Sequence, residues 1–245
     1  QSTSVDDYAF YNCRGLDGEL TYDDPLTSVG KYAFYGCSGL KGELDCSQLT
    51  SVGKYAFYGC SGLAGPLEFS SDLTEIGEYA FGDCSGFSDY LKFTIGTLHI
   101  KSCAFKGCSG FKKGTLSFVM NSNEESVSQF YYYYKYNYFL KIENEAFDDT
   151  KFKDIYYLGR FEPDCDYDIG ISSIKGIHTS SNYANKTFCN NPLHKSKLSG
   201  GAIAGIVIAV IVVVAAIVAV IVFLIIRNKK NKDQSEAEVE MNQDP

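Results

Sequence analysis

The sequence lacks the motifs by which common catalytic sites are identified. Trp is absent, and the three histidines, His99, His178 and His194, form no His-Glu-x-x-His pair. There is no Gly-x-Ser-x-Gly motif and no Cys-x-x-Cys pair. Gly30-Lys31 and Gly53-Lys54 lack the upstream Gly and the following Ser or Thr of a phosphate-binding loop. The sequence therefore predicts no catalytic residue, no metal site and no cofactor, and it disfavours an enzyme.

Positive charge is also in short supply. The chain has 22 Lys and Arg against 30 Asp and Glu, a formal net charge of -8 at pH 7. Phosphate backbones are bound by clustered Lys and Arg, so this balance argues against a nucleic-acid partner. The nine cysteines are too few for a scaffold held by disulfides alone in a chain of this length.

One long apolar run predicts a membrane span. Residues 202–226 carry no charged or polar side chain, and about 20 such residues cross the hydrocarbon core of a bilayer. An open strand would leave its backbone unpaired in lipid, so the span should be a helix. The basic cluster from Arg227 to Lys232 places the C-terminus inside. We expect a type I plasma-membrane protein with an extracellular ectodomain, a transmembrane helix at 201–226 and a cytoplasmic tail at 227–245.

Two further expectations concern this topology. A type I protein needs a signal peptide, and none precedes Gln1, so we expect that it was removed or that the sequence is a fragment. Gly201, Gly205 and Ala209 fit the small-xxx-small pattern of paired membrane helices. They are candidates for a homodimer contact, although Gly is common at this edge of a span for other reasons.

An internal repeat fills the region before the span. Tyr-Ala-Phe or a variant recurs with its Ala at positions 9, 33, 56, 80, 104 and 146, in steps of 24, 23, 24, 24 and 42. A period of 23–24 residues lies in the leucine-rich-repeat range of about 20–29. Each unit has an apolar side that only its neighbours can bury, so the units should stack into a solenoid.

The second unit shows how one coil should be built. Its inward side chains should be Leu26, Val29, Ala33, Phe34, Cys37, Leu40, Leu44 and Cys46. The alternation at 44–46 and 67–69 predicts one short strand per coil, and residues 26–29 predict a second. The Tyr-Ala-Phe-x-x-Cys segment is too short for a helix of its own and predicts a turn of helix or 3₁₀. Strands of successive coils should pair in parallel, about 4.8 Å apart.

The units define the expected domain organisation. Five coils of 23–24 residues fill residues 1–118. Residues 119–154 should contain an irregular Tyr-rich coil, at 119–138, and then the last repeat. Residues 155–200 depart from the pattern and should form a C-terminal cap and a juxtamembrane stalk, because the end units of solenoids close an open core.

The unit Leu-Thr-Ser-Val-Gly-x-Tyr-Ala-Phe-x-x-Cys-Ser-Gly-Leu, residues 26–40, resembles the repeat of BspA-like leucine-rich-repeat surface proteins. The Ile/Val-rich span, the basic stop sequence, the short acidic tail and the closing segment at 156–165 are similar to the transmembrane members of protists, trichomonads in particular. The resemblance implies a non-enzymatic leucine-rich-repeat solenoid followed by one transmembrane helix. It also implies adhesion to host cells or to extracellular-matrix proteins.

The cysteines fall into two groups. One recurs once per coil: Cys13, Cys37, Cys60, Cys84 and Cys108. They should stack about 5 Å apart, within disulfide reach, but parallel neighbours rarely meet the required dihedral, so buried reduced thiols are favoured. Outside the repeat, Cys165 and Cys189 predict a disulfide in the cap. Asn185 begins the one N-glycosylation sequon.

Two sets of residues are candidates for ligand binding. The first is an outward stripe: Glu19, Glu43, Asp45, Glu68 and Lys92. Solenoids commonly bind with such a face, although a merely solvated face explains the same residues. The second lies in the segment 130–139, where eight of ten residues are aromatic. The candidates are its six tyrosines: Tyr131, Tyr132, Tyr133, Tyr134, Tyr136 and Tyr138. A strand buries only alternate residues, so about half of these rings should face outward, as contacts or as a ladder that covers the solenoid.

Three functions are consistent with these features. The first is an adhesion protein that binds a host-cell or extracellular-matrix protein or glycan without chemistry. The second is a signalling receptor, although the 19-residue tail has no Tyr and Ser235 is its one hydroxyl. The third is a structural or antigenic coat protein without a specific ligand.

Overall fold

A computed structural model of the chain describes residues 3–112, 114–120, 139–159, 162–171, 174, 176–180, 183, 185 and 187–193. The chain divides into two units, Gln1–Lys195 and Ser196–Pro245. The second unit lies outside the described residues, and so do the predicted helix at 201–226, the tail at 227–245 and the pairing residues Gly201, Gly205 and Ala209. Within the described ranges, no helix has the length and hydropathy that a membrane crossing requires.

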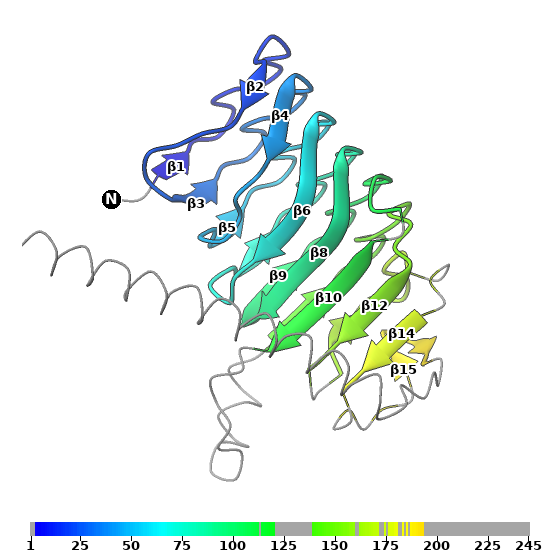
Figure 1. The fold of residues 1–245 in the computed structure, drawn as a ribbon. Helices are drawn as coiled ribbons and strands as arrows, with labels where there is room; N and C mark the ends of the chain where they lie inside the picture. The colour runs from blue at the N-terminus through cyan, green and yellow to red at the C-terminus, as the bar shows by residue number, and fades with distance from the viewer. Residues whose placement is uncertain are drawn as a thin grey trace, which may run out of the picture. The chain divides into compact units, whose positions relative to one another are not determined.

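The first unit is built from short strands that alternate between two sheets (Figure 1). The odd-numbered sheet contains, in this order, β1 (Thr3–Val5), β3 (Leu26–Val29), β5 (Ser51–Val52), β7 (Glu75–Ile76), β9 (Thr97–Ile100), β11 (Phe139–Ile142) and β13 (Asp164–Cys165). The even-numbered sheet contains β2 (Gly18–Glu19), β4 (Leu40–Glu43), β6 (Leu63–Phe69), β8 (Phe87–Ile95), β10 (Thr115–Met120), β12 (Asp154–Tyr157) and β14 (Gly176–Thr179).

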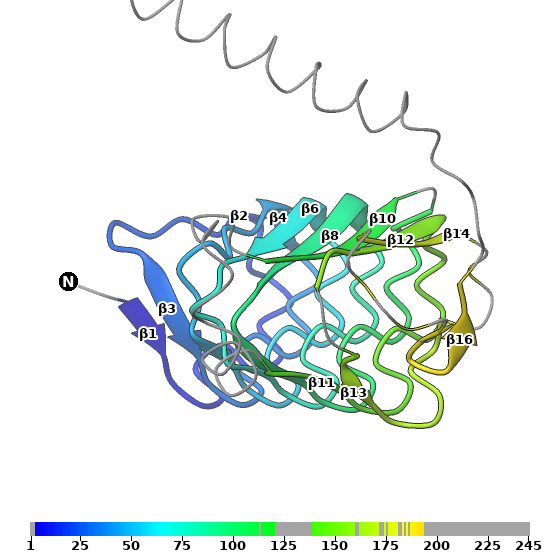
Figure 2. The same cartoon turned by 90° about the horizontal axis from the view of Figure 1, so that it is seen from below.

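Each coil contributes one strand to each sheet, and both seven-stranded sheets pair in parallel. Figure 2 shows the two sheets on opposite sides of the coils. In the odd-numbered sheet the same apolar position stays in register from coil to coil: Val29, Val52, Ile76, Ile100 and Ile142. The predicted leucine-rich-repeat solenoid with parallel strands is therefore confirmed.

The core is the stack of these apolar positions. All eight side chains predicted to face inward in the coil from Leu26 are at most 5% exposed. One aromatic column runs the length of the stack, with neighbouring ring centroids 5.0–5.7 Å apart: Phe10, Phe34, Phe57, Phe81, Phe105 and Phe147. The strand predicted at 44–46 is not formed, because β4 ends at Glu43, although Leu44 and Cys46 are buried as expected.

The turn segment, residues 30–39 and their equivalents in other coils, links the two sheets. Alternate N–H groups bond to the next coil: Tyr32 donates to Lys54 O and Phe34 to Ala56 O, at 2.9 and 2.7 Å. The N–H groups between them close local turns, as Tyr35 does to Tyr32 O at 3.2 Å. The segment is therefore a ladder of turns that adds a third line of hydrogen bonds between coils.

The first residue of each Tyr-Ala-Phe motif has a left-handed backbone. The residues concerned are Tyr8, Tyr32, Tyr55, Tyr79, Cys103 and Glu145, with φ between 54° and 61°. Bulky residues rarely adopt this conformation, so a surrounding constraint must hold them there. The hydrogen bonds to the next coil supply that constraint, because they recur at the same position.

The prediction that residues 119–138 take the place of a coil is wrong. β11 pairs directly with β9, so Phe139 lies opposite Thr97 and Ile142 opposite Ile100. The turn segments also join, since Phe105 N–H donates to Ala146 O at 2.8 Å. The step of 42 residues is one coil that contains an insertion, not two coils.

The repeat continues further than the predicted cap boundary at 155. β13 and β14 extend both sheets by one more short coil, and Glu145 N–H donates to Asp168 O at 2.7 Å. The antiparallel hairpin of β15 (Thr187–Phe188) and β16 (Asn191–Pro192) then follows, and the Phe188 ring packs beside Tyr157 at 5.0 Å. This hairpin therefore caps the C-terminal end of the solenoid core.

Candidate functional site

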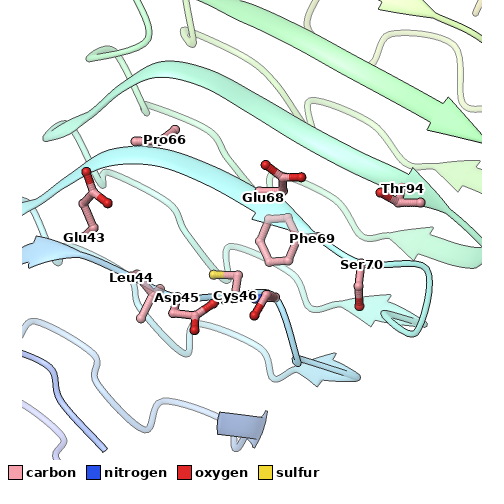
Figure 3. A pocket seen from close by; sticks show the side chains of 10 residues that line it. Glu43, Leu44, Asp45, Cys46, Pro66, Glu68, Phe69, Ser70 and Thr94 are labelled. Atoms are coloured by element: carbon pink, nitrogen blue, oxygen red, sulfur yellow. Dashed lines mark hydrogen bonds between the residues drawn. The ribbon is translucent and has the colours of Figure 1, made fainter. Parts of the chain in front are cut away.

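A pocket of about 480 Å³ opens on the even-numbered sheet between β4 and β6 (Figure 3). Its lining residues are Glu43, Leu44, Asp45, Cys46, Ser47, Pro66, Glu68, Phe69, Ser70 and Thr94. Leu44, Cys46 and Phe69 belong to the buried core, and in Figure 3 the carboxylates of Glu43 and Glu68 lie apart from one another beside them. The site thus combines an apolar base with an acidic surround.

The pocket exists because β4 and β6 separate. They pair only at Gly42 with Leu63 and at Glu43 with Ala64, and the register of β6 on β8 shifts between Gly65 and Leu67. Pro66 lies at that shift and has no N–H to donate to a neighbouring strand. By contrast, β8 and β10 pair without interruption over six residues. Loss of pairing beyond Glu43 leaves the gap that the pocket occupies.

The charges of the pocket are only partly balanced. Lys92 Nζ lies 2.5 Å from Glu68 Oε1, and Tyr90 OH lies 3.5 Å from the other carboxylate oxygen. Asp45 Oδ1 accepts a hydrogen bond from the backbone of Ser47 at 2.9 Å. The Glu43 carboxylate forms no hydrogen bond and no ion pair with the described part of the chain. Of the three carboxylates, Glu68 alone is paired with a cation among the described residues.

A metal centre does not follow from these carboxylates. In the part of the chain that the structure describes, no group of three or more His, Cys, Asp and Glu side chains is arranged to hold a metal ion. The arrangement can attract a cation that is large enough to reach several separate carboxylates, and it contains no nucleophile paired with a base.

The predicted stripe is brought together in part. Glu43, Asp45 and Glu68 line the pocket. Lys92 is not a lining residue but forms an ion pair with Glu68. Glu19 lies on the neighbouring strand β2, and its side chain covers Gly42 of β4. Its Cγ is 2.7 Å from the point that a Cβ of residue 42 would occupy. The aromatic candidates Tyr131, Tyr132, Tyr133, Tyr134, Tyr136 and Tyr138 lie outside the described residues.

The described residues after β12 contain the other two predicted sites. Cys165 and Cys189 are joined by a disulfide. Asn185 is exposed, and its side-chain amide donates to Glu162 Oε2 at 2.6 Å. Glu162 also accepts from Tyr183 OH and from the backbone of Cys189. A glycosylated Asn185 would keep one amide N–H, so this contact and a glycan are compatible.

The cysteine column consists of free thiols. Each buried thiol donates to a Phe carbonyl of the preceding coil, as Cys60 does to Phe34 O at 3.0 Å and Cys84 to Phe57 O at 2.9 Å. Burial raises the pKa of Cys60 to about 12. These thiols therefore stay protonated and fill the core, as the sequence predicted.

A double tyrosine ladder was missed from the sequence. It consists of two stacked columns on the turn segments: Tyr8, Tyr32, Tyr55 and Tyr79 in one, Tyr11, Tyr35 and Tyr58 in the other. Ring centroids within a column are 4.9–5.2 Å apart. Tyr58 OH donates to Asp83 Oδ2 at 2.5 Å, which with burial raises its pKa to about 12. The repeated Tyr-x-x-Tyr spacing was the available signal.

Parallel solenoids of stacked repeats offer extended surfaces for binding. Comparison with protein-family models gives a match to the BspA type leucine rich repeat region, with six copies, over residues 1–112 and 64–165. The chain therefore belongs to the BspA-type leucine-rich-repeat family. Searches of curated proteins and of solved structures found no match.

Proposed function

We propose that this protein is a non-enzymatic cell-surface adhesion protein whose solenoid binds a host-cell or extracellular-matrix ligand. The observation that carries the proposal is the pocket between β4 and β6, where a regular repeat surface is interrupted and core side chains line an acidic opening. Membership in a repeat family of surface-protein type supports the same role. Solenoids present such sites on a rigid sheet, so the scaffold loses little conformational entropy when a large partner binds.

The proposed setting is the plasma membrane. In this proposal residues 201–226 anchor the chain, the solenoid is extracellular and residues 227–245 are cytoplasmic, as the apolar run and its basic flank predict. Pairing through Gly201, Gly205 and Ala209 would raise avidity by presenting two solenoids together. A disulfide between Cys165 and Cys189 suits an oxidising exterior.

The test is attachment of cells that display the whole chain. Cells of a non-adherent line that express the protein should attach saturably to epithelial monolayers or to matrix-coated plates. The variant Glu43→Gln with Glu68→Gln should lower attachment several-fold at equal surface expression. Glu75→Gln with Glu78→Gln, which removes two carboxylates from other faces, should leave attachment unchanged. Absence of saturable attachment by correctly displayed protein would contradict the proposal and favour a coat or receptor function.

A further inference from the structure

We infer that the pocket between β4 and β6 binds an arginine side chain of a polypeptide partner. The inference rests on the proposed function, because it specifies the ligand of the same site. The first ground is charge. Glu43, Asp45 and Glu68 line the pocket, and Lys92 is the one cation that pairs with any of them among the described residues. The local excess is therefore negative, and a complementary ligand is cationic.

The second ground is the spacing of the carboxylates. They do not form a group suited to a metal ion in the described chain, and Figure 3 shows the three side chains separated across the pocket. A bare cation needs its oxygen ligands at about 2.0–2.6 Å on all sides. A guanidinium spreads its charge over a planar fork with five N–H donors, so it can reach two carboxylates at once. An organic cation fits this separation better than an ion does.

The third ground is the apolar base of the pocket. Leu44 and Phe69 close this base as core side chains that are 3% and 0% exposed, and the half-buried ring of Pro66 provides the apolar surface that a ligand can contact. An arginine side chain has an apolar stem that lies along such surfaces while the charged head stays near water. The same residue can therefore satisfy the apolar and the acidic parts of the lining.

The fourth ground is the polar rim. Ser47, Ser70 and Thr94 also line the pocket and offer hydroxyl groups that can both donate and accept. These groups can bond to the peptide backbone on either side of the inserted residue. A volume of about 480 Å³ exceeds a single side chain and lies within the range of about 300–1,000 Å³ for ligand pockets. The occupant is therefore an arginine within a polypeptide, not free guanidinium.

The experiment measures peptide binding to the purified whole chain in mild detergent. The probes are fluorescein-labelled Gly-Ser-Arg-Ser-Gly and the same peptide with citrulline, which keeps the shape of arginine but has no charge. Anisotropy titrations at low salt should give at least tenfold weaker binding for the citrulline peptide. Glu43→Gln with Asp45→Asn should weaken binding of the arginine peptide about tenfold, and Glu75→Gln with Glu78→Gln should not.

The outcomes separate this inference from the proposed function. Equal binding of the two peptides, or an unchanged affinity in the Glu43 and Asp45 variant, would overturn the arginine site. If cell attachment persisted in that case, the adhesion proposal would stand and its contact would lie elsewhere. If the arginine peptide bound as expected while displayed protein failed to attach to cells, the site would stand and the adhesion role would fall.

Discussion

Replacing residues 121–138 by one glycine should leave the solenoid folded and make it more stable. In the preceding coil, β8 ends at Ile95 and β9 begins at Thr97, so Gly96 alone connects the two sheets. Met120 pairs with Ile95, and Phe139 pairs with Thr97. Met120 and Phe139, which the insertion joins, therefore occupy the same positions as Ile95 and Thr97, which Gly96 alone joins in the preceding coil.

The magnitude follows from loop closure. Loop closure costs about (3/2)RT ln n, so shortening the eighteen residues 121–138 to one saves up to roughly 2.5 kcal/mol. For a domain of this size, 1 kcal/mol shifts the melting temperature by about 2–4 °C, which predicts a rise of about 5–10 °C. The strand pairs on both sides stay as they are, so the fold should lose no core contact.

Thermal unfolding of the whole chain, followed by near-UV circular dichroism, measures this effect. A control in which an 18-residue Gly/Ser segment replaces 121–138 should melt near the temperature of the unchanged protein. A lower melting temperature for the one-glycine variant, or loss of a cooperative transition, would refute the reasoning. It would mean that residues 121–138 supply contacts that the coil needs.

Three other predictions concern the described residues. Phe57→Ala should cost about 3–5 kcal/mol in urea unfolding, because the ring is 0% exposed between two stacked rings. Cys60 should resist a thiol reagent at pH 8 in the native protein and react after denaturation, because its raised pKa and burial leave no exposed thiolate. Burial alone would raise the pKa of Glu143, but bonds from Ser102 and His99 outweigh it, and the pKa is lowered in the folded state. Glu143→Gln should therefore lower the unfolding free energy by about 1–3 kcal/mol at pH 7, and the difference should vanish as the pH falls below the folded pKa.

Much of the coil could be predicted from sequence because burial enforces periodicity. The inward positions recur every 23–24 residues and are apolar in most units, so one coil was enough to name its core. The extended piece at Leu26–Val29 was identified for the same reason. The thiols of the cysteine column were also predictable, since stacked parallel positions favour packing over disulfides.

The insertion could not be assigned in this way. A step of 42 residues is consistent with two short coils or with one interrupted coil. Composition does not distinguish them, because an aromatic-rich segment suits either. The distinction depends on which strands pair, and the contact of β9 with β11 settles it. The left-handed backbone at the first residue of each Tyr-Ala-Phe motif could not be predicted either. Tyrosine has no intrinsic preference for that conformation, and the hydrogen bonds between coils impose it.

The pocket depends on a local break that sequence patterns did not expose. Glu43, Asp45 and Glu68 were predicted as one stripe because strand periodicity points them outward. Regular pairing would have spaced them evenly over a flat surface. Pro66 and the shift in register after Gly65 instead separate two strands and convert part of the stripe into a concave site.

The tyrosine ladder and the pocket illustrate why the break, not the regular surface, is the better candidate for binding. Within the ladder the facing sides of neighbouring rings cover one another at 4.9–5.2 Å, so the inner rings offer a partner only their edges and hydroxyl groups. The ladder therefore stabilises the stacking of coils, at about 0.5–1.5 kcal/mol for each pair beyond burial. At the pocket, by contrast, the chain after β4 no longer pairs with β6. The carboxylate of Glu43 has no partner there among the described residues. Where the repeat is interrupted, the solenoid therefore offers a concave, acidic surface that its regular faces lack.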